Sequence, residues 1–314
     1  MAICKYCGRP LILSSGKCLY CGKAPNESSR PEDNKKVGGK SKQIVQRRTS
    51  VTNGGQSPYS QYAGQSIIPD AITDMFGNPQ GSQYDLAKDG AFKGYKIVVV
   101  NFGMSPPFKN QNNPIMALNK KGFQVTVFEG SFPNEEIKKA LDAKTQLWII
   151  AGSTPLMNQE NYSLVYDHFN KGRGLYIWSD NAPLFADSNI ILSHMFGSRM
   201  SGEYYGDHVL TIQTGDKQPG IIKNHPITTG LQNFYEGITV SNVKLTQDLK
   251  PLVYSSDGLI VTAYFDKDGK RALIDGGFTR LYDSFWVRAA GTDRFVVNCA
   301  AWLTNIERFG YHPE

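Results

Sequence analysis

The 314-residue sequence lacks three features that would have narrowed its function at once. No apolar run approaches the roughly 18 residues that span a bilayer, so we expect neither a membrane segment nor a membrane partner. The opening MAICKYCGRP lacks the basic and then apolar layout of a signal peptide, which predicts a cytoplasmic location. No G-x-G-x-x-G phrase follows the apolar stretch at 95–100, where the chain reads NFGMSPP, so that fingerprint of a nucleotide site is missing.

Positive charge is scarce outside the first fifth of the chain. Residues 1–50 hold eleven Lys or Arg and three Asp or Glu, a net charge of +8, which leaves −2 for residues 51–314 of the total of +6. A basic arm attracts phosphates, anionic lipid heads or acidic protein surfaces with little selectivity. A solvated linker kept open by like charge explains the same composition, and both interpretations stay open.

Four of the five cysteines lie within the first 21 residues, in the pattern C-x2-C-x10-C-x2-C. Two residues between the cysteines of a pair let both thiolates reach one ion, and four thiolates make a closed tetrahedral site. We therefore expect a structural zinc ion, with the ligands Cys4, Cys7, Cys18 and Cys21. The intervening PLILSSGK predicts a short hairpin. Disulfides are the alternative, which a leaderless chain argues against.

This segment resembles the small zinc ribbons that open many bacterial and archaeal multidomain proteins. Such ribbons bind nucleic acid in some proteins and dock other proteins elsewhere, so the motif predicts the metal but not the partner. The next stretch, to residue 66, is rich in Ser, Gly, Asn, Gln and Lys and cannot bury enough apolar area to offset its ordering entropy. We expect a zinc ribbon at 1–23, a flexible basic linker at 24–66, and an α/β domain at 67–314 that begins with a short helix at 67–79.

Strand and helix patterns alternate after residue 94. YKIVVVNFG is a continuous β-branched run, typical of a strand buried on both faces. The predicted strands are 95–103, 123–130, 146–154 and 174–178. The predicted helices are 112–122, 134–144, with Asn134 as its N-cap, and 158–172. Strand, helix, strand at this spacing predicts right-handed crossovers and a mostly parallel, flavodoxin-like sheet with helices on both faces.

Small and polar residues follow these strands, at the edge where open parallel sheets bind ligands. In GLYIWSDNAPLF (174–185) the apolar run stops abruptly at Ser179 and restarts after Pro183. LIDGGFTRLYD (273–283) adds a carboxylate, two glycines and a guanidinium, which could hold an anion. The predicted ligand-binding residues are Asn101, Ser153, Thr154, Ser179, Asp180, Asn181, Asp275 and Arg280. An ion pair of Arg280 with Asp283 at the surface, or with Asp180 in the interior, is the alternative.

Three phrases carry a resemblance to a known superfamily. They are NHPITTGLQNFYEGITV (224–240), DGKRALIDGGFTRLYD (268–283) and RFVVNCAAWLTNIER (294–308). Together with the strand order they resemble the class I glutamine amidotransferase-like superfamily, above all its ThuA-like branch and the related domains of gliding-motility and intraflagellar-transport proteins. The resemblance covers about residues 94–308 and implies an amidotransferase-like α/β fold.

The sequence departs from this superfamily where catalysis is expected. Amidotransferase members carry a cysteine between glycines in the turn after the corresponding strand, with a His and a Glu late in the chain. This chain has Ser179, Asp180 and Asn181 in that turn, and FTRLYDSFW after the last strand contains no histidine. Cys299, with apolar neighbours on the final helix, is predicted to be a core residue. We therefore expect no cysteine-based glutamine hydrolysis.

Three histidines are candidates for a base that would activate Ser179. His225, before Pro226, is predicted to anchor a loop, and His194, in ILSHMFG, to occupy a helical core position. The polar pair of Asp207 and His208 precedes the strand HVLTIQ, where a loop hydrogen bond is favoured over a second metal site.

The sequence thus offers a crevice but no complete set of acid, base and nucleophile, so no residue is predicted to be catalytic. The expected function is recognition: a non-catalytic domain that binds a small ligand or a protein and docks to a partner through its zinc ribbon. A hydrolase or carbohydrate-modifying enzyme of the ThuA-like kind is one alternative, which requires a histidine brought to the turn by the fold. A nucleic-acid-binding protein that uses the ribbon and basic residues at 35–48 is the other.

Overall fold

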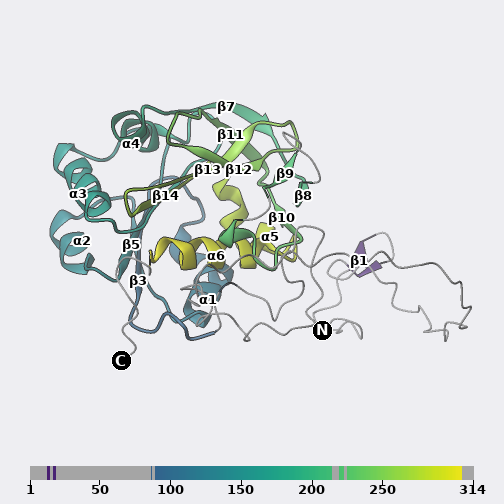
Figure 1. Ribbon diagram of the computed structural model, residues 1–314, viewed down its shortest axis with the longest axis horizontal. Coiled ribbons are helices and arrows are strands. Elements are labelled where there is room, and N and C mark those ends of the chain that lie inside the picture. Colours follow the sequence, from purple (N-terminus) through teal and green to yellow (C-terminus); the bar gives the residue numbers. More distant parts are fainter. Residues whose placement is uncertain are drawn as a thin grey trace, which may run out of the picture. The chain divides into compact units, whose positions relative to one another are not determined.

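A computed structural model of the chain describes residues 86, 89–213, 219–222 and 225–305, together with two strands near the N-terminus. The chain divides into two compact units, Met1–Gly55 and Gln56–Glu314. In the first unit, β1 (Leu13–Ser14) pairs antiparallel with β2 (Lys17–Cys18), which confirms the hairpin expected between the cysteine pairs (Figure 1). The side chains of the four cysteines, the linker at 24–66 and the helix expected at 67–79 lie outside the described residues.

An eight-stranded sheet forms the centre of the second unit, in the order β4-β3-β5-β6-β14-β13-β12-β9 (Figure 1). The parallel strands are β4 (Gln124–Glu129), β3 (Lys96–Asn101), β5 (Thr145–Ile150), β6 (Leu175–Trp178) and β14 (Lys270–Asp275). The strands that pair antiparallel are β13 (Ile260–Lys267), β12 (Lys250–Tyr254) and β9 (Gly220–Ile221). The order of the first four strands is that of flavodoxin-like sheets, so the predicted mostly parallel α/β fold is confirmed.

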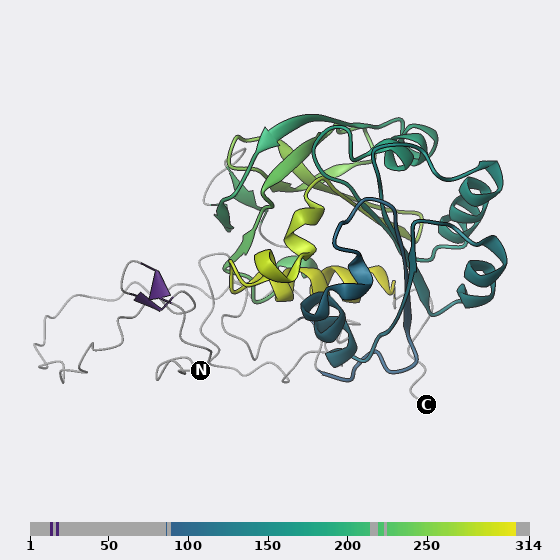
Figure 2. The same cartoon turned by 180° about the vertical axis from the view of Figure 1, so that it is seen from behind.

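Helices cover both faces of this sheet (Figures 1 and 2). One face carries α2 (Asn134–Ala140), α3 (Gln159–Asn170) and α4 (Ala186–Phe196), and the other carries α1 (Asn112–Lys120) and α6 (Thr292–Leu303). Successive strand residues feed the two cores alternately: Val98 and Ile149 pack with α3, whereas Val99 and Trp148 pack with α6. Both faces of the sheet are therefore covered by apolar side chains and excluded from water, which explains the continuous apolar runs in the sequence.

Helix α2 differs from its prediction at both ends. It stops at Ala140 instead of continuing to 144, and Pro133 instead of Asn134 occupies the N-cap position. The Asn134 side chain has another task, because its Oδ1 accepts a hydrogen bond from Asn161 Nδ2 at 2.7 Å. Asn161 in turn forms a capping box with Asn158 at the start of α3. The first turns of the two helices are thereby tied together.

Two small sheets are inserted between β6 and β12. In one, β7 (Met200–Tyr205) pairs with β11 (Thr239–Val243), and in the other β8 (Val209–Thr211) pairs with β10 (Asn233–Tyr235). The segment 235–240, which includes the last residue of β10 and the first two residues of β11, runs along the carboxyl edge of the main sheet. Ile238 N donates to Thr279 Oγ1 at 2.9 Å, and Ser241 N donates to Gly276 O at 2.8 Å. This segment therefore covers the turn that follows β14.

The HPIT phrase is anchored to the last helix. His225 caps the short 3-10 helix η4 (Pro226–Thr228), and its Nδ1 accepts from Ile227 N at 3.2 Å. Asn298 of α6 donates from Nδ2 to the carbonyl oxygens of Ile227 and Thr229, both at 2.9 Å. The prediction that His225 anchors a loop is confirmed. None of the helices in the described ranges has the length and apolar content that a membrane crossing requires.

Candidate functional site

The space at the carboxyl ends of β3 and β5, where flavodoxin-like sheets bind ligands, is filled by the chain itself. Asn101, nearly fully buried, accepts at Oδ1 from Gly103 N and Met104 N and donates from Nδ2 to Glu129 Oε2 at 2.6 Å. A Cβ atom at Gly103 would lie 2.0 Å from Ala151 O, so the two loops meet backbone to backbone. Asn101 therefore shapes its own loop, while Ser153 and Thr154 lie exposed.

The turn after β6 joins β6 to β14. Ser179 is fully buried, and its side-chain Oγ donates to Ser188 Oγ at 2.8 Å. Its backbone N donates to Asp275 O at 2.8 Å, and its backbone O accepts from Phe278 N at 2.9 Å. Within the described ranges no histidine makes a hydrogen bond to Ser179. A serine without a base is a poor nucleophile. The polar residue Ser179, which interrupts the apolar run GLYIWSDNAPLF, therefore connects β6 to β14 and its turn inside the protein.

Asp180, the next residue, is a fully buried carboxyl group. Its Oδ1 accepts from Asn181 N at 2.8 Å, and its Oδ2 accepts from Thr279 N at 3.1 Å. Burial removes water from the charged form and raises the pKa of Asp180 to about 7, although these hydrogen bonds and the charge of Arg280 act in the opposite direction. Burial therefore favours the protonated side chain of Asp180 over a wider pH range than for an ordinary aspartate.

The two oxygen contacts of the Thr239 hydroxyl independently favour the protonated form of Asp180. Thr239 Oγ1 lies 2.9 Å from Asp180 Oδ1 and 2.8 Å from Asn181 Oδ1, but a hydroxyl has only one proton to donate. The Asn181 amide is oriented by its Nδ2, which donates to Ala182 O at 3.0 Å and to Glu203 Oε1 at 3.2 Å. Both short contacts are satisfied when Asp180 donates to Thr239 and Thr239 donates to Asn181.

Arg280 and Asp275 form an ion pair that is sealed from water. Both side chains have zero exposed fraction, and Arg280 Nη1 donates to Asp275 Oδ2 at 2.5 Å. Nη2 donates to the backbone oxygen of Glu236 at 2.5 Å, and the guanidinium lies 4.8 Å from the Phe234 ring centroid. Burial raises the pKa of Asp275, whereas the Arg280 charge lowers it. The ion-pair partner of Arg280 is thus Asp275, and not Asp283 or Asp180.

The structure therefore brings together five of the predicted ligand-binding residues. Ser179, Asp180, Asn181, Asp275 and Arg280 form one cluster under the segment 235–240, whereas Asn101, Ser153 and Thr154 lie at the ends of β3 and β5. Of the five, only Asn181 is partly exposed. Sequence reasoning missed Thr239 and Thr279, because hydroxyls and backbone amides 59 and 99 residues from Asp180 give no local pattern.

A second polar group lies at the same edge, beside the sealed cluster. His208 Nδ1 lies 3.2 Å from Glu236 Oε1, the ring is 59% exposed, and the Glu236 side chain has zero exposed fraction. Glu236 lies in NFYEGITV, one of the phrases that carry the resemblance, and for His208 the sequence favours a loop hydrogen bond over a metal site. The hydrogen bond to Glu236 is present. No group of three or more metal-ligating side chains occurs in the part of the chain that the structure describes.

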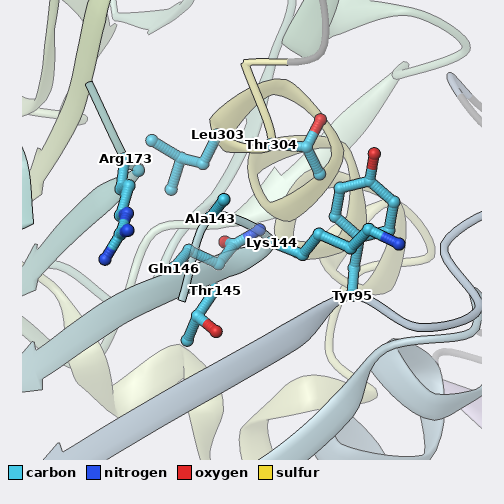
Figure 3. A pocket seen from close by; sticks show the side chains of 9 residues that line it. Tyr95, Ala143, Lys144, Thr145, Gln146, Arg173, Leu303 and Thr304 are labelled. Atoms are coloured by element: carbon cyan, nitrogen blue, oxygen red, sulfur yellow. The ribbon is translucent and has the colours of Figure 1, made fainter. Parts of the chain in front are cut away.

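A pocket opens at the opposite, amino end of the parallel strands (Figure 3). Tyr95, Lys144, Gln146, Arg173 and Thr304 contribute to its wall. Its cavity volume is about 10 Å³, close to what a single water molecule needs. None of the predicted ligand-binding residues lines this pocket, which is too small for a larger ligand.

Two further expectations concern single side chains. Cys299 is fully buried on α6, and burial raises the pKa of its thiol far above the ordinary value, which agrees with a core role. The prediction of a core position for His194 is wrong. This residue is exposed on α4 and stacks on Tyr166 at a ring distance of 4.3 Å, because the apolar neighbours Ile191 and Leu192 face the core instead.

Comparison with known proteins gives only distant likenesses. No protein-family model and no curated protein matches the chain. A solved protein from Bacteroides uniformis, described as ThuA-like, shares 10% identity over 67% of this chain and 91% of its own, with a TM-score of 0.45. A cytoplasmic protein from Salmonella typhimurium shares 9% identity over 66% of this chain and 98% of its own, with a TM-score of 0.42.

A third solved structure is Agd3, described as a carbohydrate deacetylase. It shares 10% identity over 64% of this chain, with a TM-score of 0.38, and the match spans about a third (32%) of its length. At these scores none of the three likenesses assigns an activity to this chain. The fold class rests on the chain's own strand order, and the function rests on its site.

Proposed function

We propose that the α/β domain is a recognition module that binds a small ligand or a protein at the carboxyl edge of β6 and β14, with no nucleophile in the turn after β6. The burial of Ser179 carries this proposal, because its hydroxyl is directed to Ser188 and faces neither water nor a base. A buried serine without a histidine cannot start acyl transfer.

The residues that can contact a ligand lie at the surface around the buried cluster of Ser179, Asp180, Asp275 and Arg280. Asn181 is partly exposed and contacts the exposed Glu203, and Ser153 and Thr154 are exposed at the end of β5. The buried hydrogen bonds beneath Asn181 fix its side-chain orientation, which reduces the entropy that a ligand must overcome on binding. A rigid polar rim on a closed interior suits binding better than turnover.

We also propose that the N-terminal segment holds a structural zinc ion and docks the domain to a partner. The cysteine spacing and the hairpin β1–β2 between the pairs support this assignment. Metal analysis that finds less than one zinc ion per full-length chain would contradict it. A partner among nucleic acids would show itself by an affinity that falls steeply with salt and requires residues 1–50.

The experiment for the turn compares the full-length chain with Ser179→Ala. We expect no ammonia from glutamine with either chain, and any ester hydrolysis by the chain should be the same in both. The hydroxyl contributes only one internal hydrogen bond, so the variant should lose about 1 kcal/mol of unfolding free energy at most. A loss of measurable hydrolysis in Ser179→Ala, with an unchanged circular dichroism spectrum, would overturn the proposal.

A further inference from the structure

Glu236 is a buried carboxylate that is held in one position. Its Oε2 accepts from Ser256 N at 2.8 Å, and its Oε1 accepts from Ser256 Oγ at 2.7 Å. Backbone closes over it, because a Cβ atom at Gly206 would lie 3.1 Å from Glu236 Cγ. A carboxylate is costly to remove from water, and hydrogen bonds offset only part of that cost. A buried carboxylate such as that of Glu236 is therefore expected where its negative charge acts on a neighbouring group.

His208 is the side chain on which this charge acts. Its Nδ1 is the third partner of the carboxylate, at 3.2 Å from Oε1. The backbone fixes the pair, since Glu236 N donates to His208 O at 3.1 Å and Val209 lies opposite Tyr235 in the β8–β10 ladder. An ionised carboxylate can only accept, so Nδ1 carries the proton and Nε2 of the neutral ring carries the lone pair. The ring is 59% exposed, so this base is available to a reactant.

A cation is paired with the residue that precedes this base. Arg288 follows α5 (Asp283–Trp286), and its Nη1 is paired with Asp207, the residue before His208. Its guanidinium lies 5.3 Å from the Tyr235 ring centroid and 4.9 Å from that of Phe285, and the side chain is 42% exposed. An arginine has five N–H donors, so the pair with Asp207 leaves capacity for an anionic group of a ligand.

Apolar surface completes the surroundings. Tyr205 is 67% exposed and Val209 is 49% exposed, and both flank the Asp207–His208 dipeptide in sequence. They are two of only five large apolar side chains that are exposed in the described part of the chain. Strand β8 pairs with β10, and Tyr235 of β10 stacks on Phe285 of α5 with ring centroids 5.9 Å apart, so the small sheet lies beside α5 (Figure 1). An exposed aromatic ring next to a base and a cation is suited to an aryl or acyl group.

We propose that His208, oriented by Glu236, is a general base that hydrolyses small esters that carry a negative charge, with Arg288 as the residue that holds this charge. The activity goes beyond the recognition proposed above and uses no residue of the turn after β6.

The step needs only water as co-reactant. His208 Nε2 takes a proton from a water molecule, and the water oxygen forms a bond to the carbonyl carbon of the ester. The tetrahedral adduct then collapses, the bond to the alcohol oxygen breaks, and the imidazolium returns its proton to that oxygen. The products are a carboxylic acid and an alcohol. Glu236 stabilises the imidazolium that forms between the two proton transfers.

The test uses the full-length chain with two probes, 4-nitrophenyl succinate, which is anionic, and 4-nitrophenyl acetate, which is neutral. We expect hydrolysis of the anionic ester above the buffer rate, and a loss of about 100-fold in kcat/KM in His208→Gln. Arg288→Met should remove the preference for the anionic ester, mainly through KM. His194→Gln is the matched control, since His194 is another exposed histidine that stacks on Tyr166, and its kcat/KM should be unchanged.

Glu236 is a positioning residue and needs its own measurement. Glu236→Gln keeps an acceptor for Nδ1 but removes the negative charge that stabilises the imidazolium, so kcat should fall about tenfold while KM stays unchanged. If this variant does not fold, Ser256→Ala, which loosens the carboxylate, should lower kcat several-fold.

Three results would overturn the proposal. They are hydrolysis of neither ester above the buffer rate, an unchanged rate in His208→Gln, or an equal loss in His194→Gln. The failure of this proposal is distinct from failure of the proposed recognition function, which depends on Ser179→Ala.

Discussion

Two buried carboxyl groups at one edge of the sheet, Asp180 and Glu236, have opposite surroundings. Asp180 is hydrogen-bonded to Thr239, Thr279 and its neighbour Asn181, which are half-buried. Glu236 directs its charge to a ring that is more than half exposed. The carboxyl end of a strand therefore does not by itself identify a binding group. Residues at a strand end can bind a ligand only if no other segment covers that end, and here segment 235–240 covers it.

The largest effect should come from breaking the sealed ion pair. Arg280→Met leaves Asp275 buried and uncompensated, and we expect a loss of about 3–5 kcal/mol in unfolding free energy, measured by urea denaturation. Arg288→Met is the control, because Arg288 also has an aspartate partner and two aromatic neighbours but is 42% exposed. It should lose about 1 kcal/mol or less. Equal losses in the two variants would remove the distinction between the two regions.

The second effect concerns the pH dependence of stability at Asp180. The pKa of Asp180 is about 7 in the folded chain and 3.8 as the reference, so the folded state keeps a proton that the unfolded chain has released. The contribution of Asp180 is therefore fully present below about pH 4 and is lost as pH rises to about 7. The difference in pKa corresponds to about 4 kcal/mol in unfolding free energy.

Asp180→Asn tests this prediction by urea denaturation at several pH values between 4 and 8. The amide mimics the protonated acid, so the unfolding free energy of the variant should fall less than that of the unaltered chain over this range. Asp257→Asn, at an exposed aspartate in the β12–β13 turn, should follow the unaltered chain. A variant curve parallel to the unaltered one would mean that Asp180 is ionised throughout.

The smallest effect should come from Thr239, which links Asp180 to the rim. Thr239→Val keeps the shape of the side chain but removes the hydroxyl, so we expect a loss of about 1 kcal/mol in unfolding free energy. Thr239→Ser keeps the hydroxyl and should lose less. If valine were tolerated as well as serine, the proton shared between Asp180 and Asn181 would not contribute to stability.

The fold was more predictable than the site. The predicted strands 95–103, 123–130 and 174–178 contain the observed strands, and 146–154 misses only the first residue of β5, because continuous apolar runs between helical patterns have few other interpretations. The three helices were also predicted, with a wrong N-cap and a wrong last residue for α2. The antiparallel extension by β13, β12 and β9 was not predicted, since it depends on pairing between distant segments.

The sequence indicated which residues follow the strands, but not how deeply they are buried. Residues at strand ends could be identified, and Asp180, Asp275 and Arg280 do form one cluster with their neighbours. Their burial depends on segment 235–240, whose contacts are set by long-range folding. The Glu236–His208 pair joins residues 28 positions apart in two short strands, and no local spacing indicates it.

The contact between Gly103 and Ala151 has a practical consequence for protein engineering. A cofactor site placed at the usual position in a flavodoxin-like sheet would need space that backbone atoms of the two loops already occupy. Trimming side chains cannot create that space, because neither residue has a side chain large enough to remove. A designer would have to lengthen the loop after β3 or the loop after β5, or graft new chemistry onto the far side of β14, where the sheet turns antiparallel.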